Sequence, residues 1–475
     1  MYCGSMTDDT TDGSLERVLS RWQLFAIGFG AIVGWGWIIQ MGYWIDEAGP
    51  YGAMAAFAIG GVLVLLVALI YGELVSAMPF AGGEHVYTHR AFGPAVSFVC
   101  SWSLLLGYMG VVGFQSIALG IGFSYLIPGF DMLALWTFAG QTVYGSWVAV
   151  GFLGILAITF LNYRGVEITA QVQLVLATVI AISGIALVTG SLTVGPSVSN
   201  AAFGGAPALG ITIVAIQVPM LFVGFDVVPQ AAEEADMSSR SLALVVLAVV
   251  ATVGLFYIVS IWAAGGAVAA GALGDSLVPA ATAMTAIFGS TVAGKLMTIV
   301  GIGALLTSWS AFVIGASRIV FAMADSGLLP ESLATVHPEY NTPSRAIVLI
   351  GALSMAAPWF GGNFVSSIIN AGSLGIVLAW FTVAVSFVAL RYNEPEMERP
   401  FKLPGGYTFG IAAMVVTLFF IGLYMPGAPS ALLWPREWAI VVAWIVLGAV
   451  LFALSRRSTT ETTMEETRQP VSEQQ

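Results

Sequence analysis

Two glycine-containing segments interrupt long apolar stretches at corresponding places in the two halves of the chain. The first is Gly30-Ala-Ile-Val-Gly34-Trp-Gly36, and the second is Val223-Gly224-Phe225-Asp226. Glycine weakens a helix in lipid, where freed N–H and C=O groups find no partner, so such glycines are expected where the backbone faces a cavity or a ligand. Matched interruptions of this kind are typical of the substrate site of a secondary transporter.

The second segment also contains an acidic residue, Asp226, well inside an apolar stretch. A carboxylate within a membrane span is costly unless it is paired, protonated or in contact with water. Asp226 is therefore a candidate for proton coupling. The alternative is a structural acid that caps or bridges an interrupted helix.

The composition sets the class of protein that must position these residues. The chain has 475 residues, of which 58% are hydrophobic and 9% are charged, and its mean hydropathy is +0.92. A soluble protein would carry roughly 25% charged residues. The sequence therefore predicts an all-α polytopic membrane protein that lies in the lipid bilayer. The net charge of -11 argues against a nucleic-acid partner.

Hydropathy predicts about twelve membrane spans, each near the ~20 residues that a bilayer core requires. No cleavable signal peptide is evident, because the first apolar run begins near Trp22 and is long enough to span. The polar ends, 1–21 and 456–475, are expected to be disordered tails. The predicted spans are 22–44, 52–78, 92–126, 141–161, 169–191, 208–233, 241–271, 290–324, 345–361, 364–390, 408–425 and 434–455.

The distribution of basic residues predicts the orientation of these spans. Cytoplasmic loops should hold most of the Lys and Arg residues. With the N-terminus inside, only Lys295 and Arg436 fall on the outer side. We therefore expect a multi-pass protein of the plasma membrane with both termini in the cytoplasm.

Metal and cofactor sites are not predicted. Cys3 lies in a tail and Cys100 in a predicted span, and the three histidines lie in inner loops without metal-ligand spacing. A membrane enzyme would need a nucleophile and base, a metal cluster or a cofactor motif, and none is present. The chain is not expected to be an enzyme.

Several sequence blocks, in order along the chain, resemble the amino acid–polyamine–organocation permeases. They extend from the first predicted span to the loop before the eleventh, and they cover most of the chain. The blocks are 30–36, Tyr71-Gly-Glu-Leu-Val-Ser-Ala-Met-Pro79-Phe-Ala-Gly82-Gly83-Glu84-His-Val-Tyr87, Asn162-Tyr-Arg164-Gly165, Phe225-Asp226 with Glu233-Glu234, Ser317-Arg318 to Pro330, Thr342-Pro343 and Glu398-Arg399-Pro400.

This resemblance implies a fold of two inverted five-helix repeats. The repeats would be 22–191 and 208–390, followed by two accessory helices over 408–455, with the first and sixth helices broken at the midplane. Members of the family move amino acids or amines by alternating access. The chain is therefore expected to be a secondary active transporter of amino acids, either a symporter or an exchanger, with no obligate protein partner.

The resemblance also assigns candidate substrate-binding residues. Backbone amides in the first broken helix resemble a cradle for a substrate carboxylate, which fits the partial positive charge of a half-helix N-terminus. Carbonyl groups in the sixth helix would accept hydrogen bonds from an ammonium group. The backbone candidates are Ile32, Val33, Gly34, Trp35, Gly36, Phe222, Val223, Gly224 and Phe225.

Three side chains are further candidates for the same site. Phe312 stands where related exchangers carry an aromatic gate, although an aromatic side chain at this depth is also common in plain packing. Tyr108 and Gln115 lie two helical turns apart on the third predicted span. Both are expected to face the cavity.

Two features depart from the family pattern. Trp35 stands where a small residue is usual, and Trp37 follows it. Either indole could face the scaffold or line the site, where a cation–π contact with an ammonium would be worth ~0.5–2 kcal/mol. The Lys that many proton-coupled members carry in the fifth helix is replaced by Ile180.

Ion coupling is therefore open at this stage. Thr307, Ser308 and Ser310 could contribute to a sodium site, although hydroxyls at helical spacing more often bond a backbone carbonyl. Asp226 resembles the acid linked to pH response in acid-resistance exchangers of the family. Coupling to H+, coupling to Na+ and exchange without an ion all remain alternatives.

Charged residues cluster at the predicted inner helix ends. Glu73, Glu233, Glu234, Arg318 and Asp325 are candidates for ion pairs of a gate, and solvated interfacial charge is the commoner explanation.

Other functional classes fit less well. An ion channel would show a repeated filter or charged rings. A transporter-like nutrient sensor would need more room for a signalling partner than the short tails leave. A permease for a small amine such as ethanolamine or a polyamine is the main alternative substrate class, because Trp35 and the run from Gly224 to Glu234 resemble amine-transporting relatives.

Overall fold

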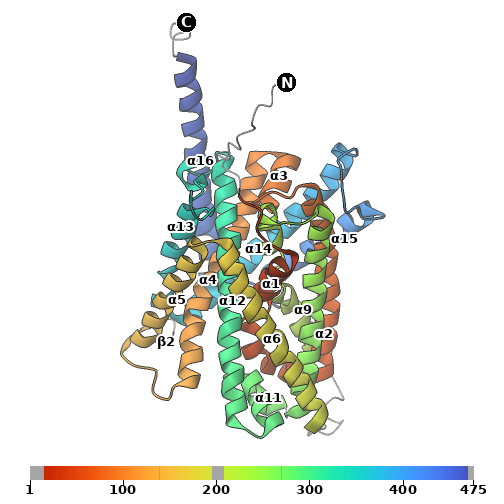
Figure 1. Ribbon diagram of the computed structural model, residues 1–475, viewed down its shortest axis with the longest axis vertical. Helices are drawn as coiled ribbons and strands as arrows, with labels where there is room; N and C mark the ends of the chain where they lie inside the picture. The colour runs from red at the N-terminus through yellow and green to blue at the C-terminus, as the bar shows by residue number, and fades with distance from the viewer. Residues whose placement is uncertain (1–14, 139, 195–207, 269, 469–475) are drawn as a thin grey trace, which may run out of the picture.

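The computed structural model describes residues 15–138, 140–194, 208–268 and 270–468 (Figure 1). It is built mainly from helices. The first part contains α1 (Arg21–Ile32), α2 (Gly36–Ala77), α3 (Glu84–Phe92), α4 (Pro94–Leu126), β1 (Ala134–Phe138), β2 (Gln141–Tyr144), α5 (Gly145–Tyr163) and α6 (Val166–Val194). The second part contains α7 (Ala208–Leu221), α8 (Val227–Gln230), α9 (Ser239–Ala267), α10 (Ala270–Gly274), α11 (Pro279–Phe288), α12 (Thr291–Asp325), α13 (Ser344–Ser354), α14 (Gly361–Asn393), α15 (Gly406–Leu423) and α16 (Arg436–Arg468).

Within the described residues, nine helices are long and apolar enough to cross a membrane. They are α2, α4, α5, α6, α9, α12, α14, α15 and α16. Large apolar side chains also cover much of their outer surface, as expected where lipid replaces water. The protein is a multi-pass membrane protein.

The longest helix, α2, is too long for one span. Its 42 residues extend roughly 60 Å at the α-helical rise, about twice the thickness of a bilayer core. Gly49 has a φ of 67°, and Pro50 follows it, so the helical hydrogen bonding is interrupted there. The chain therefore changes direction within α2.

The helices pack in an order that places segments from both halves side by side. α2 packs against α7 and α9, and α4 packs against α12 and α14. α3 and the end of α16 lie at one end of the molecule, whereas α11 and the β-hairpin lie at the other (Figure 1). We refer to these as the α3 end and the hairpin end.

The expectation of an all-α fold was wrong in one place. β1 and β2 form an antiparallel hairpin in which Trp136 pairs with Val143, so the span predicted to begin at 141 begins at Gly145. Hydropathy does not separate a short apolar strand from the start of a span, although aromatic and Thr residues favour strands. The short helices α3, α10 and α11 were also not predicted.

Segments flanking the spans are more ordered than the predicted tails. The N–H groups of Val18 and Leu19 donate to Glu234 O at 3.0 and 2.8 Å, and the Asp236 N–H donates to Leu19 O at 2.9 Å. At the other end, α16 continues past the predicted limit of 455 to Arg468, because helical hydrogen bonding need not stop where hydrophobicity does. The remaining tail residues, including Cys3, lie outside the described residues.

Candidate functional site

The first helix break separates α1 from α2. α1 ends at Ile32, Val33 has φ −83° and ψ 62°, and α2 begins at Gly36. The Gly34 N–H donates back to Ile32 O at 2.9 Å, but no hydrogen bond among the described residues uses the N–H of Trp35 or Gly36. Free N–H groups at a helix start carry partial positive charge. This break can bind an anionic group such as a carboxylate.

The second break separates α7 from α8. α7 ends at Leu221 and α8 begins at Val227. Between them Gly224 has φ +123°, and a Cβ added there would come within 2.7 Å of the Ala31 Cβ. Glycine is therefore required both by the backbone conformation and by the close approach of the first break. Hydrogen bonds within the described chain leave the C=O groups of Phe222 and Val223 free to accept.

Tyr257 links the two breaks. This residue of α9 places its hydroxyl 3.3 Å from both Ile32 O and Leu221 O, which are the last residues of α1 and α7. The contact holds the two half-helices beside each other. Nothing in the sequence around Tyr257 marked it, because its role depends on two carbonyls that only the fold brings together.

A cavity of about 250 Å³ lies beside the two breaks. None of the described residues that line it carries a charge. The lining includes these residues from the prediction: Ile32, Gly34, Trp35, Gly36, Gln115, Val223, Ser308 and Phe312. It also includes polar residues that the prediction missed, namely Gln40, Tyr257 and Asn370. Gln40 could have been found as a lone amide one turn beyond Gly36 in an apolar helix.

The other predicted substrate-binding residues do not line this cavity. They are Val33, Phe222, Gly224, Phe225 and Tyr108. Phe225 packs instead against the rings of Tyr71 and Trp380, at centroid distances of 5.3 and 5.1 Å. Tyr108 meets the cavity only through Phe312, whose ring it contacts edge-on at 5.0 Å. Successive side chains of an irregular segment point in different directions, so only some can reach one cavity.

The two tryptophans at the first break both pack between helices. The Trp35 indole lies against Gly301 of α12 and Gly122 of α4, where an added Cβ would meet ring atoms at 2.7 and 3.3 Å. The Trp37 indole is fully buried and contacts Phe256 edge-on at 5.0 Å. Small residues on neighbouring helices therefore make room for the Trp35 ring, which forms part of the cavity wall.

Asp226 lies in the second break and is completely buried. One carboxyl oxygen accepts the Gly224 N–H at 2.8 Å, and the other accepts the Trp380 indole N–H at 3.2 Å. No Lys or Arg pairs with it among the described residues. The Gly224 contact spans the break as a structural acid would. A buried carboxylate without a cation is costly, so Asp226 depends on these two N–H donors.

The hydroxyls proposed for a sodium site are occupied within the protein. Thr307 donates to Ala304 O at 2.7 Å, and Ser308 donates to Ala31 O at 2.9 Å. Ser308 and Ser310 also accept, from Gln115 at 2.9 Å and from Asn162 at 3.0 Å. In this conformation the hydroxyls therefore form a network that joins α1, α4, α5 and α12. The described residues also contain no group of three or more His, Cys, Asp or Glu that could hold a metal.

A comparison with known protein families identifies the family to which the chain belongs. The family model described as amino acid permease matches residues 19–451, which include both helix breaks and every element around the cavity. The chain belongs to the amino acid permease family. It is a transporter and not an enzyme.

The permease is similar over most of its length to curated bacterial transporters. It is 26% identical over 462 residues to the branched-chain amino acid permease BcaP of Bacillus subtilis (strain 168), with 94% of each chain covered. It is also 26% identical over 456 residues to the methylthioribose transporter of that organism, again with 94% of each covered. The aspartate-proton symporter of the same organism is 25% identical, over 86% of this chain and 79% of the relative.

At the α3 end of the permease, buried ion pairs join neighbouring elements. Arg318 of α12 donates two hydrogen bonds to Glu234, at 2.8 and 2.9 Å, and both side chains are buried. Glu73 of α2 binds Arg391 and Arg399, with 3.1 Å to the latter. Solvated charge is therefore the wrong interpretation for Glu234, Arg318 and Glu73.

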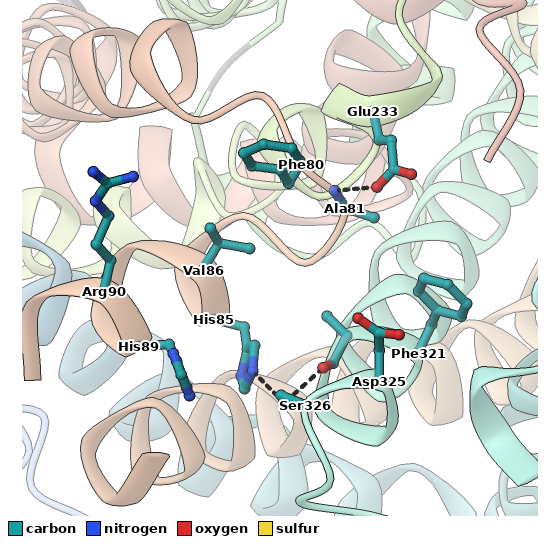
Figure 2. A pocket seen from close by; sticks show the side chains of 11 residues that line it. Phe80, Ala81, His85, Val86, His89, Arg90, Glu233, Phe321, Asp325 and Ser326 are labelled. Carbon is teal, nitrogen blue, oxygen red and sulfur yellow. Dashed lines mark hydrogen bonds between the residues drawn. The ribbon is translucent and has the colours of Figure 1, made fainter. Parts of the chain in front are cut away.

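Beside these pairs lies a second cavity of about 490 Å³, between α3, the turn Ala232–Glu234 that follows α8, and the end of α12 (Figure 2). The Glu233 carboxylate accepts the N–H groups of Leu15 and Ala81 at 3.0 Å each, which ties the N-terminal segment to this wall. His85 contacts Ser101 and Ser326 at 2.9 and 2.8 Å. Burial, with a smaller contribution from His89, lowers the pKa of His85 to about 4.

Proposed function

We propose that this permease is a secondary active transporter of amino acids with uncharged side chains, working by alternating access in the plasma membrane. The observation that carries the proposal is the neutral cavity beside two helix breaks, with free N–H groups on one break and free C=O groups on the other. A zwitterion presents the opposite charges to these groups.

The substrate carboxylate would bind the N–H groups of Trp35 and Gly36, and its ammonium would bind the C=O group of Val223, which lines the cavity. The substrate side chain would then point toward Phe312 and the other uncharged wall residues. A charged side chain would lose its hydration there without gaining a partner, which disfavours lysine, glutamate and diamines. An amine without a carboxylate would leave the N–H groups of the first break unpaired.

Twelve spans are consistent with the nine long apolar helices. α2 supplies part of one predicted span and all of the next, since it turns at Gly49. The predicted spans 208–233 and 345–361 are divided into α7 with α8 and into α13 with the short turn Ala357–Trp359. We therefore assign five spans each to 22–191 and 208–390, as inverted repeats, with α15 and α16 as accessory helices. The distribution of basic residues supports a cytoplasmic α3 end.

Proton symport through Asp226 is the coupling that these contacts favour. Asp226 is buried without a cation and accepts a hydrogen bond across the moving helix break. A carboxyl in such a site changes protonation when its surroundings change from closed to water-filled. Among the relatives, one is named as an aspartate-proton symporter.

The experiment is uptake into proteoliposomes at two external pH values, using leucine and three analogues. Isopentylamine lacks the carboxylate, leucinamide replaces it with a neutral group, and lysine adds a charge to the side chain. Leucine alone should enter, and faster at the lower external pH. Entry of the amine but not leucine would instead indicate an amine permease, and equal entry of lysine would contradict the neutral-cavity argument.

A further inference from the structure

Glu84, at the start of α3, is a buried carboxyl that the proposed transport cycle does not use. Its side chain is completely inaccessible to solvent. One carboxyl oxygen accepts a hydrogen bond from the Gln230 amide at the end of α8, and the other has no partner among the described residues. Glu84 therefore joins the start of α3 to the end of α8.

Among the described residues, no cation pairs with Glu84. From the elements packed around it, the titratable neighbours are Tyr71 of α2, Tyr87 of α3, Cys100 and Tyr108 of α4, and Asp226 at the second break. The Tyr71 hydroxyl approaches the carboxyl without forming a well-aligned hydrogen bond. Burial, assisted by repulsion from Asp226, raises the pKa of Glu84 well above its usual value.

The surroundings of Glu84 differ from those of the neighbouring buried acids. Glu234 is paired with Arg318, and Glu73 with two arginines. An acid that holds helices together by charge needs such a partner, because burial of an unpaired carboxylate is costly. Within the part of the chain that the structure describes, Glu84 and Asp226 instead accept hydrogen bonds from neutral donors, and each lies within electrostatic reach of the other.

Glu84 lies next in sequence to a residue of a cavity wall. His85, Val86, His89 and Arg90 of α3 line the cavity of about 490 Å³ at the α3 end (Figure 2), and Glu84 is buried behind them. Gly83 packs directly on α8, since a Cβ added there would lie 3.0 Å from Pro229. Movement of α8 away from α3 would therefore break the Gln230 contact and uncover Glu84 beside His85, which lines this cavity.

We propose that Glu84 is a second proton-carrying carboxyl, which passes protons from Asp226 to the cytoplasmic cavity. When α8 swings open, the Glu84 O–H bond breaks and the proton leaves to water in the cavity. When α8 closes again, the buried Glu84 carboxylate takes the proton of Asp226, with Tyr71 facing both groups. Asp226 is then left as a carboxylate and is reprotonated from the outer side, so one proton crosses per cycle.

This inference rests on the proposed alternating access and on Asp226 as the outer proton site. Its test compares the wild type, Glu84→Gln and the control Asp325→Asn in proteoliposomes that contain a pH-sensitive dye. Asp325 is an exposed carboxylate of the same cavity. Two rates are measured for leucine, namely exchange at equal pH and accumulation driven by an inward proton gradient.

Glu84→Gln should keep exchange but lose gradient-driven accumulation and the accompanying dye signal, whereas Asp325→Asn should keep both. Accumulation by Glu84→Gln at the wild-type rate would overturn the proposal. Leucine uptake by the wild type without proton movement would overturn it as well, while leaving amino acid transport intact.

A second measurement does not depend on transport. The infrared spectrum of the purified wild type at neutral pH should contain a protonated-carboxyl absorption that is lost in Glu84→Gln and retained in Asp325→Asn. If the two variants have the same protonated-carboxyl absorption as the wild type, Glu84 holds no proton and the proposal fails, whatever the substrate is.

Discussion

The cavity beside the helix breaks and the closed α3 end differ in how they handle charge. The described walls of the cavity are neutral, and their binding capacity comes from backbone groups left free by the breaks. At the α3 end, by contrast, Glu234 and Glu73 are bound to arginines. The free N–H and C=O groups of the breaks can release one small ligand and bind another at little cost in free energy. Buried ion pairs are strongly coupled, so they hold one conformation until both partners are released together.

The largest effect should come from breaking the Glu234–Arg318 pair. Arg318→Met leaves Glu234 buried without a cation, so we expect a loss of about 3–5 kcal/mol in stability. The loss would be measured as a lower midpoint of thermal unfolding in detergent. The double variant Glu234→Met/Arg318→Met removes both charges and should recover most of the stability. If the single and double variants unfold alike, the closed end does not depend on this pair.

A smaller effect should come from His85, which the α3 end keeps neutral. Its folded pKa of about 4 lies below the usual 6.5 of an unfolded histidine. Between these values the unfolded chain binds more protons, so stability falls as the pH drops from 6.5 to 4. This difference is worth about 3 kcal/mol at pH 4. Thermal unfolding of the wild type should thus lose more stability over this range than that of His85→Gln.

The same measurement on His89→Gln is the control, because His89 lies on the same cavity and has no comparable burial. It should keep most of the wild-type pH dependence, because burial is the larger cause of the lowered pKa of His85. Equal pH dependence in the wild type and His85→Gln would mean that His85 is not kept neutral by the fold.

The smallest effect should come from a substitution in the neutral cavity beside the helix breaks. Ser308→Ala removes the hydroxyl that donates to Ala31 O and accepts from Gln115. Its loss should cost about 1 kcal/mol of stability and raise the KM for the substrate, because α1 beside the first break is held less firmly. Thr298→Val is the matched control on α12, where the hydroxyl bonds only its own helix. A KM that is equally raised in both variants would argue against a role specific to the cavity.

The sequence could predict the helix breaks because their cause is local. Glycines such as Gly34, Gly36 and Gly224 indicate a flexible backbone wherever glycine occurs in an apolar span. The orientation of the spans is likewise predicted from the positions of the basic residues alone. By contrast, the side of a helix break on which an aromatic ring packs depends on residues that are far away in sequence. Trp35 packs into space left by Gly122 and Gly301, which belong to helices far away in sequence.

The partners of the buried acids also could not be predicted from the sequence. Glu234 and Glu84 both lie near a helix end, and the sequence does not indicate that Glu234 pairs with Arg318 whereas Glu84 bonds Gln230. The partner of each depends on how α8 and α3 come together. The β-hairpin was missed for a different reason, since strands of this length and apolarity do not differ in hydropathy from the start of a helix.

The hydrogen bond from Leu15 to Glu233 joins residues that are 218 positions apart. During synthesis, Leu15 leaves the ribosome about 10 to 40 s before Glu233, at typical elongation rates. The first half of the protein therefore enters the membrane with its N-terminal segment unattached. Only after the second half has been inserted can this segment dock, so the seal at the α3 end forms late in biogenesis.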